Sequence, residues 1–367
     1  MQYLLPVLLA AHFLLLLNIW MNRVSIRRRY SGPSGQTAES HAESGTSDQL
    51  LISILVPARN EADNLPRLIR SFKEQSYPWS EMIIYDDQSD DATWEIMVAA
   101  SDTGENIKAI KGGPLTQGWV GKVHACHSLA KAAKGDVFLF LDADTKFLHP
   151  CALHRFVDLY RSRHPDTVIT GIPEIRGGGL LIVSMVGHFI LSLVPWWLKN
   201  KIPASIFAGV NGQCWIIDGG LYRSLMPHAA VHDQVLEDVM IGRYLHRNGV
   251  TPVLVDISPE LAVYMYSDLR ATWGGFRKNA SAMLGANTGT ALCSWLIYVL
   301  LYVAAPLFFP VLFLSLMVLK LSTDRAIGQP FWISLLTPVS VVLIAFLGLD
   351  SIVARSRKRL VWKGRKI

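Results

Sequence analysis

The first twenty residues form an almost unbroken apolar run, with no charge before Arg23. About 20 apolar residues are needed to cross the hydrocarbon core of a bilayer. A secretory signal peptide carries its positive charge before the apolar stretch, whereas here Arg23 and residues 27–29 follow it, so an uncleaved anchor over 1–20 is the better interpretation. Basic flanks favour the cytoplasm, which predicts an N-terminus outside the cell membrane and the following domain inside.

Two further apolar runs, 291–319 and 331–349, lie near the other end of the chain. They predict a transmembrane hairpin over 291–350, in which Pro306, Pro310 and Pro338 would be tolerated as kinks. The basic tail, 351–367, is then expected in the cytoplasm. Hydrophobic residues make up 51% of the chain and charged residues 17%, which argues against an ordinary soluble protein. The net charge of +6 is concentrated beside the apolar runs, a placement that favours anionic lipid headgroups over nucleic acid.

A fourth apolar stretch, 180–198, is harder to assign. Hydropathy alone would make it a span, but a crossing there would separate acidic residues that we expect to share one site. We therefore expect an interfacial or acceptor-facing helix, with Trp196 and Trp197 at headgroup level. A buried core helix of the soluble domain is an equal alternative. Residues 21–49 end in a stretch rich in Ser, Gly and Thr and are expected to form a flexible linker.

Between 50 and 290 the pattern changes to alternating strands and helices. Strands are predicted at 50–56, 82–85 and 137–141, and helices at 62–75 and 93–101. This order indicates an α/β domain with a mainly parallel sheet, whose ligands bind at the carboxyl ends of the strands. Polar residues fall at those ends, where we expect a nucleotide: Pro57, Asn60, Glu61, Asp86, Asp87, Asp142 and Asp144.

Asp142 and Asp144 place two carboxylates on alternate residues after the apolar strand 137–141. Like charges so close need a counter-charge, and Mg²⁺ or Mn²⁺ shared with two phosphates supplies one without a full protein cage. An Asp-x-Asp sequence alone is a weak signal, because solvated loops produce it by chance. Its position after a buried strand favours a metal site.

Glu237 and Asp238 begin a segment with helical periodicity that continues to Gly249. Carboxylates in a first helical turn are favoured by the helix dipole, so a capping role is one interpretation. The other is a general base, since a sugar acceptor hydroxyl is a poor nucleophile until a carboxylate takes its proton.

Six motifs, taken together, resemble family-2 glycosyltransferases of the GT-A fold. They are residues 52–61 (ISILVPARNE), the acidic segment 86–91, Gly121-Lys122, the Asp142/Asp144 pair, Asn211-Gly212-Gln213 and Glu237-Asp238. Their order and spacing across 50–247 also match the family. The resemblance implies a nucleotide-diphospho-sugar transferase domain.

The resemblance also implies a role for each matching residue. Nucleoside contacts would come from Pro57, Ala58, Arg59, Asn60, Glu61, Asp86 and Asp87, with Asp86 as the base-binding acid. Lys122 would lie near the phosphates, Asp144 would be the principal metal ligand, and Asp142 would lie near the ribose or the metal. Asp238 resembles the catalytic base beside Glu237, and Asn211, Gly212 and Gln213 would face the acceptor. Glu61 as a helix cap and Lys122 as a solvated loop lysine remain alternatives.

A looser likeness links the C-terminal motifs to a membrane-anchored subgroup that includes carotenoid-acid and hopanoid-cluster glycosyltransferases. The Gln-x-x-Arg-Trp motif of processive synthases is not recognisable around Arg277, so single additions are expected. The expected activity is inverting transfer from a nucleotide-diphosphate sugar, a UDP-sugar in the first instance, to a lipid-like acceptor such as a carotenoid or another isoprenoid. The alternatives are a processive synthase or its accessory subunit, and a non-catalytic membrane protein that binds sugar nucleotides.

Overall fold

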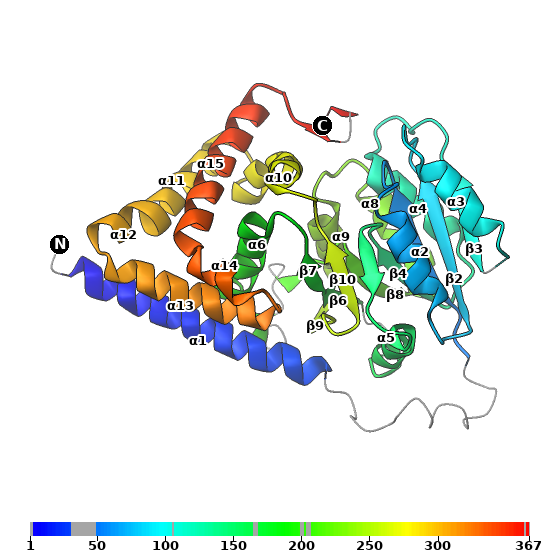
Figure 1. Ribbon diagram of the computed structural model, residues 1–367, viewed down its shortest axis with the longest axis horizontal. Helices are drawn as coiled ribbons and strands as arrows, with labels where there is room; N and C mark the ends of the chain where they lie inside the picture. Colours follow the sequence, from blue (N-terminus) through cyan, green and yellow to red (C-terminus); the bar gives the residue numbers. More distant parts are fainter. Residues whose placement is uncertain are drawn as a thin grey trace. The chain divides into compact units, whose positions relative to one another are not determined.

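The computed structural model describes residues 3–30, 49–104, 106–163, 168–198, 202, 207–362 and 365–366 (Figure 1). The chain divides into two compact units. The helical unit comprises Met1–Ser25, Glu174–Ile202 and Tyr264–Ile367, and the sheet unit comprises Ile26–Pro173 and Pro203–Val263.

A seven-stranded sheet forms the centre of the sheet unit, with the strand order β3-β2-β1-β4-β8-β6-β9. β8 runs antiparallel to β4 and β6, and the remaining neighbours are parallel, so the expected mainly parallel α/β sheet is confirmed. β5 (Thr145–Phe147) pairs outside this sheet with β10 (Leu261–Tyr264). The seven strands are β1 (Ile52–Ala58), β2 (Ser80–Asp86), β3 (Ile107–Lys111), β4 (Val137–Leu141), β6 (Ile169–Ile172), β8 (Cys214–Asp218) and β9 (Val253–Asp256).

Helices cover both faces of this sheet. The alternation of side chains along a strand divides β4 between two cores, with Leu139 and Leu141 on one face and Phe138 and Phe140 on the other. One face packs against α2 (Leu65–Lys73), α3 (Thr93–Ser101) and α5 (Ala152–Arg161). The other packs against α4 (Gly121–Ala132), α7 (Gly219–Leu225), α8 (Pro227–Ala230) and α9 (Glu237–Arg247).

The predicted elements agree with these bounds most closely where the periodicity is uninterrupted. β4 and α3 have the predicted limits, and α9 begins at Glu237. α2 starts at Leu65 instead of residue 62, because Pro66 occupies its first turn and a tight turn closed by the Leu65 N–H on the Glu61 carbonyl precedes it.

The helical unit contains three helical stretches that are long and apolar enough to cross a membrane: Leu4–Ile26, Thr288–Phe308 and Thr337–Ser356. They lie within α1 (Leu4–Tyr30), in α11 (Thr288–Tyr298) with its π-helical continuation η4 (Val299–Ala304) and α12 (Ala305–Phe308), and in α15 (Thr337–Ser356). The unit also contains β7 (Glu174–Arg176), α6 (Leu180–Leu193), the 3-10 turn η2 (Trp196–Leu198), α10 (Leu269–Leu284), α13 (Val311–Ala326), α14 (Phe331–Leu335) and the hairpin of β11 (Val361–Trp362) and β12 (Arg365–Lys366).

The apolar run 291–319 is not one helix, as the sequence suggested, but two. α12 ends at Phe308, and Pro310 is the residue before the first turn of α13. Proline lacks the N–H that would continue the helical ladder and its ring clashes with the preceding turn, so it ends the first helix here instead of kinking it.

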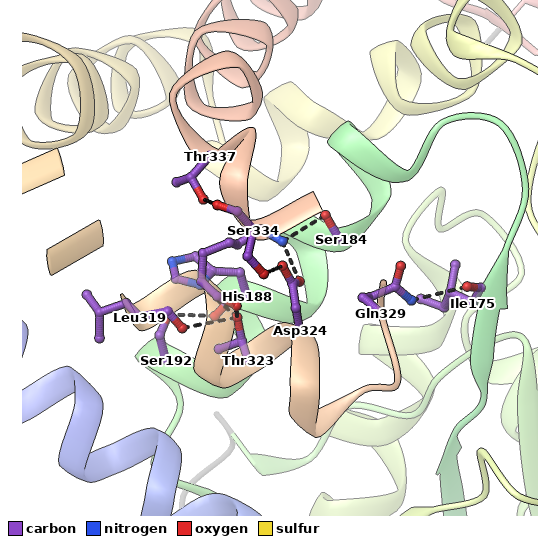
Figure 2. A network of polar contacts seen from close by, with 11 residues as sticks. Ile175, Ser184, His188, Ser192, Leu319, Thr323, Asp324, Gln329, Ser334 and Thr337 are labelled. Atoms are coloured by element: carbon purple, nitrogen blue, oxygen red, sulfur yellow. Dashed lines mark hydrogen bonds and ion pairs between the residues drawn. The ribbon is translucent and has the colours of Figure 1, made fainter. Parts of the chain in front are cut away.

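A buried ion pair holds α13 against α6 and α14 (Figure 2). Lys320 pairs with Asp324 one turn later, and each side chain is 1% exposed. The Lys320 ammonium also donates to Ser184 Oγ of α6 at 2.9 Å, and the Ser334 hydroxyl of α14 donates to Asp324 Oδ2 at 2.8 Å. Both charges therefore have polar partners within this group of helices, as buried charges require.

The C-terminal end of α6 is held by amide side chains of α1. Asn18 Nδ2 donates to the Ser192 carbonyl at 2.8 Å, and Asn22 Nδ2 donates to the Leu191 and Val194 carbonyls at 2.8 and 2.7 Å. These bonds satisfy carbonyls that a helix end leaves without intrahelical partners.

Trp196, which we expected at headgroup level, is only 7% exposed and donates its indole N–H to the Ile190 carbonyl. One face of α6 is buried within the helical unit, whereas Ile190 and Leu193 on the same helix are exposed. An interfacial or acceptor-facing role for 180–198 stays a prediction.

Candidate active site

The loops that follow β1 and β2 are joined by several hydrogen bonds. Arg59 Nη1 donates to the carbonyls of Asp87 and Gln88 at 2.5 and 2.9 Å. Asn60 adopts a φ of +52°, a conformation that Asn tolerates better than most residues, and its side-chain oxygen accepts from the Asp90 N–H at 2.8 Å. The predicted nucleoside-binding residues of the two loops therefore form one connected group.

Asp86 closes the end of β2 and is 2% exposed. Its Oδ1 accepts from the Ser89 N–H at 3.0 Å, and Asp87, which is 5% exposed, donates its own N–H to the Ala58 carbonyl. Glu61 Oε2 accepts from Asn64 at 2.7 Å, in the turn that leads into α2. These hydrogen bonds hold the backbone in place around the three acids.

A second cluster forms where β4 ends. Lys122, from the first turn of α4, places its ammonium 2.7 Å from Asp142 Oδ1 and 3.5 Å from Glu237 Oε1. Asp142 is the first residue after β4, and Glu237 and Asp238 form the first turn of α9, so three elements far apart in sequence converge. The Asp142 N–H donates to the Gln213 carbonyl at 3.3 Å, which brings the loop 211–213 beside them.

The loop 211–213 contributes mainly its backbone. Asn211 Nδ2 donates to the Gly171 carbonyl at 2.8 Å, and its Oδ1 accepts from the Gln213 N–H at 3.1 Å, so this side chain holds the loop in place. A Cβ on Gly212 would lie 3.4 Å from Lys122 Nζ and 3.7 Å from Glu237 Oε1. Gly212 therefore borders the charged cluster.

Charge and burial shift the proton affinities of this cluster. Burial, with the negative charge of Glu237 beside it, raises the pKa of Asp238 to about 6, although the Val239 N–H donates to its Oδ1 at 2.7 Å. Burial alone lowers the pKa of an ammonium, but the charges of Asp142 and Glu237 outweigh it and raise the pKa of Lys122 well above its usual range. Lys122 is a cation at neutral pH, and the pKa of Asp238 lies near the pH at which a general base works best.

The cluster lines a small cavity between α4, β4, β8 and α9. The predicted site residues in its lining are Pro57, Lys122, Asp142, Gly212, Glu237 and Asp238. The other lining residues were not among the predicted site residues: Cys126, Phe140, Leu141, Val210, Trp215, His228 and Ile241.

A local sequence pattern could have identified Cys126. Cys126 follows Lys122 by four residues on α4, which places both on the same helical face. Phe140 and Trp215 stack across neighbouring strands at a ring separation of 4.4 Å, a tertiary contact without a local signal. His228 has its Nδ1 within 2.7 Å of the Tyr222 hydroxyl, and burial lowers its pKa to about 3, so it is neutral.

The acidic residues after β4 suit a hard divalent cation. Asp142 and Asp144 lie in one turn between β4 and β5, in which the Thr145 hydroxyl donates to the Asp142 carbonyl at 2.9 Å. Within the part of the chain that the structure describes, no three His, Cys, Asp or Glu side chains are grouped so that they could hold a metal ion. Mg²⁺ commonly binds through one or two carboxylates together with substrate phosphates, and this pair of aspartates fits that pattern.

Comparison with known proteins agrees with this geometry. Residues 53–210 match the family described as glycosyl transferase family 2. The 4,4'-diaponeurosporenoate glycosyltransferase of Staphylococcus haemolyticus (strain JCSC1435) is 35% identical over 109 residues, which cover 30% of this chain and 28% of the relative. The enzyme of the same name from Staphylococcus aureus (strain USA300) is 22% identical over 257 residues, covering 67% of this chain and 65% of the relative.

Among solved structures, the mannosyltransferase PcManGT from Pyrobaculum calidifontis, in complex with GDP-Man and Mn²⁺, matches 98% of both chains with a TM-score of 0.53 and 16% identity. At this identity the match establishes the fold. Together with the family match over β1 to the loop before β8, it confirms the expected architecture. The chain therefore has a GT-A-like α/β fold, and within it residues 53–210 match glycosyl transferase family 2.

Proposed function

We propose that this chain is an inverting glycosyltransferase that adds a single sugar from a nucleotide-diphosphate sugar to a lipid-like acceptor at a membrane surface. The observation that carries the proposal is the convergence of Lys122, Asp142, Glu237 and Asp238 at the carboxyl end of β4. It combines a fixed cation, acids suited to a metal and a carboxylate whose pKa is raised to about 6. These are the groups that displacement of a nucleoside diphosphate requires.

In this mechanism Asp238 takes the proton of the acceptor hydroxyl as its oxygen forms a bond to the anomeric carbon. The bond from that carbon to the diphosphate breaks on the opposite side, so the configuration inverts. A positioned base of this kind contributes on the order of 10²–10⁴-fold to the rate. Lys122 would bind the departing diphosphate, whose negative charge increases as the bond breaks.

The donor nucleoside is assigned to the connected loops after β1 and β2. Asp86 and Asp87 would contact the base, and Arg59 to Glu61 would form the wall of that site. Asp142 and Asp144 would hold Mg²⁺ or Mn²⁺, and such a cation neutralises charge on the diphosphate when it is bound. The complex of PcManGT with GDP-Man and Mn²⁺ supports a nucleotide-sugar donor used with a divalent ion.

The helical unit and the relatives support the proposed acceptor and location. Three stretches are long and apolar enough to cross a membrane; Arg23 lies in the last turn of the first of them, and three further arginines, 27–29, follow it. By the positive-inside rule the catalytic domain would face the cytoplasm and the N-terminus the outside. The names of the two staphylococcal relatives favour a carotenoid or another isoprenoid acceptor.

The test is a screen of UDP- and GDP-sugars with the full-length protein in lipid nanodiscs, with Mg²⁺ or Mn²⁺ present. Lipids from cells producing the wild type or Asp238→Asn are then compared by mass spectrometry. We expect one sugar per acceptor, in the inverted configuration, and loss of the product with Asp238→Asn while donor affinity persists. A long polymer, retained configuration or an unimpaired Asp238→Asn variant would contradict the proposal.

A further inference from the structure

Lys122 occupies the position of a counter-ion within the acidic cluster. Its ammonium contacts two carboxylates from different elements, Asp142 at 2.7 Å and Glu237 at 3.5 Å, and its side chain is 23% exposed. The first distance is that of a direct, charge-assisted hydrogen bond. In this arrangement one of the two candidate metal ligands already has a cationic partner from the chain itself.

An ammonium and a divalent cation on the same carboxylate repel each other strongly in a partly buried site. The ion pair of Asp142 with Lys122 therefore lowers the affinity of Asp142 for a metal ion, and a bound metal ion would weaken that ion pair. A bound diphosphate changes this balance, because its oxygens offer the ammonium a second anionic partner. Lys122 lies in the first turn of α4 and its long side chain can reorient while the helix stays in place.

We propose that Lys122 is an internal counter-ion that holds Asp142 and Glu237 in the ligand-free protein, and that the diphosphate of the donor draws it away before a divalent cation can bind there. The inference rests on the proposed function and adds an order of binding to it. The metal ion alone binds weakly, and nucleotide and metal each raise the affinity for the other, as thermodynamic linkage requires.

Chelation of Mn²⁺ by the nucleotide in solution would also couple the two ligands, so the decisive measurement uses the metal alone. Mn²⁺ is titrated into full-length protein in nanodiscs without nucleotide, and the free ion is followed by electron paramagnetic resonance. Lys122→Gln removes the counter-ion. Lys131→Gln, an exposed lysine on the same helix, is the matched control for charge and helix position.

We expect Lys122→Gln to bind Mn²⁺ alone about tenfold more tightly or better, which lies within the usual range of coupling between sites. Lys122→Arg keeps the charge and should bind Mn²⁺ as weakly as the wild type. If Lys122→Gln fails to fold, Lys122→Gln combined with Glu237→Gln restores the charge balance and should still bind Mn²⁺ more tightly than the wild type. The control should match the wild type.

Unchanged or weaker binding of Mn²⁺ to the folded single or double variant would overturn the inference, because Lys122 would then be a structural or phosphate-binding residue only. Such a result would leave the proposed function intact if wild-type protein still transfers sugar. Absence of transfer from all donors would instead count against the proposed function, whatever the Mn²⁺ titration gives.

Discussion

In the proposed mechanism, the protonation of Asp238 sets the pH at which transfer begins. Its pKa is raised to about 6, first by burial and then by the charge of Glu237. Only the ionised carboxylate can take a proton, so kcat/KM should increase with pH through about 6 and level off above it. Below that pH the ionised fraction falls tenfold for each pH unit, which gives about a tenth of the plateau at pH 5.

Changing Glu237 to Gln tests the electrostatic part of this reasoning. The variant removes the neighbouring negative charge but leaves Asp238 buried, so the rise in kcat/KM should move to lower pH without reaching the range of an exposed carboxyl. Initial rates are measured from about pH 4.5 to 8 at constant ionic strength, with donor below its KM and nucleoside diphosphate release as the readout.

The affinities for donor and Mn²⁺ are measured over the same pH range, so that a fall in kcat/KM caused by loss of metal at low pH can be recognised. If kcat/KM of Glu237→Gln rises at the same pH as in the wild type or at a higher one, Glu237 does not raise the pKa of Asp238. A flat wild-type profile down to about pH 4 would refute the role of Asp238 as the base.

Three further predictions concern other parts of the chain. Asp144→Asn should abolish transfer and lower metal-dependent donor affinity by about 10–100-fold in calorimetry, and unchanged activity across Mn²⁺ concentrations would contradict it. Gly242→Ala should lower both the melting temperature and the transfer rate, because its Cβ would lie 1.4 Å from the Ala208 carbonyl oxygen. Gly274→Ala is the control: a Cβ there has open space around it, so the variant should not destabilise the protein. Lys320→Met should destabilise the protein by about 3–5 kcal/mol in thermal unfolding, because it leaves Asp324 buried and charged, and a change of both residues to apolar ones should restore most of that loss. Equal melting temperatures of the two glycine variants would contradict the close packing at Gly242. Equal melting temperatures of Lys320→Met and the wild type would contradict the role of the buried ion pair.

Those parts of the fold that depend on neighbouring residues could be predicted from the sequence. The apolar run of β4 and the two acids that open α9 are local signals; both limits of β4 and the start of α9 were predicted, whereas α9 ends at Arg247, two residues earlier than expected. The polar residues after β1, β2 and β4 could be grouped because parallel strands bring their carboxyl ends to one edge.

The rest of the site depends on contacts that the chain makes only after folding. The ion pair of Lys122 with Asp142 joins α4 to the end of β4, and nothing in their spacing predicts it. His228 lines the cavity from the short helix α8, whose sequence has no periodic pattern. Asn211, predicted to face the acceptor, donates to the Gly171 carbonyl instead. Pro310 shows the same limit in the helical unit, because whether a proline kinks or ends a helix depends on its neighbours in space.

The hydrogen bonds between the loops after β1 and β2 have a consequence for attempts to change the donor. Arg59 and Asn60 bond to the backbone of 87–90, and the Glu61 N–H donates to the Thr93 hydroxyl. If only one of these loops were replaced by that of another transferase, the remaining loop would lose its hydrogen-bond partners. Under the proposed assignment of the donor nucleoside to these loops, segments 58–62 and 86–93 should therefore be exchanged together when a new donor specificity is introduced.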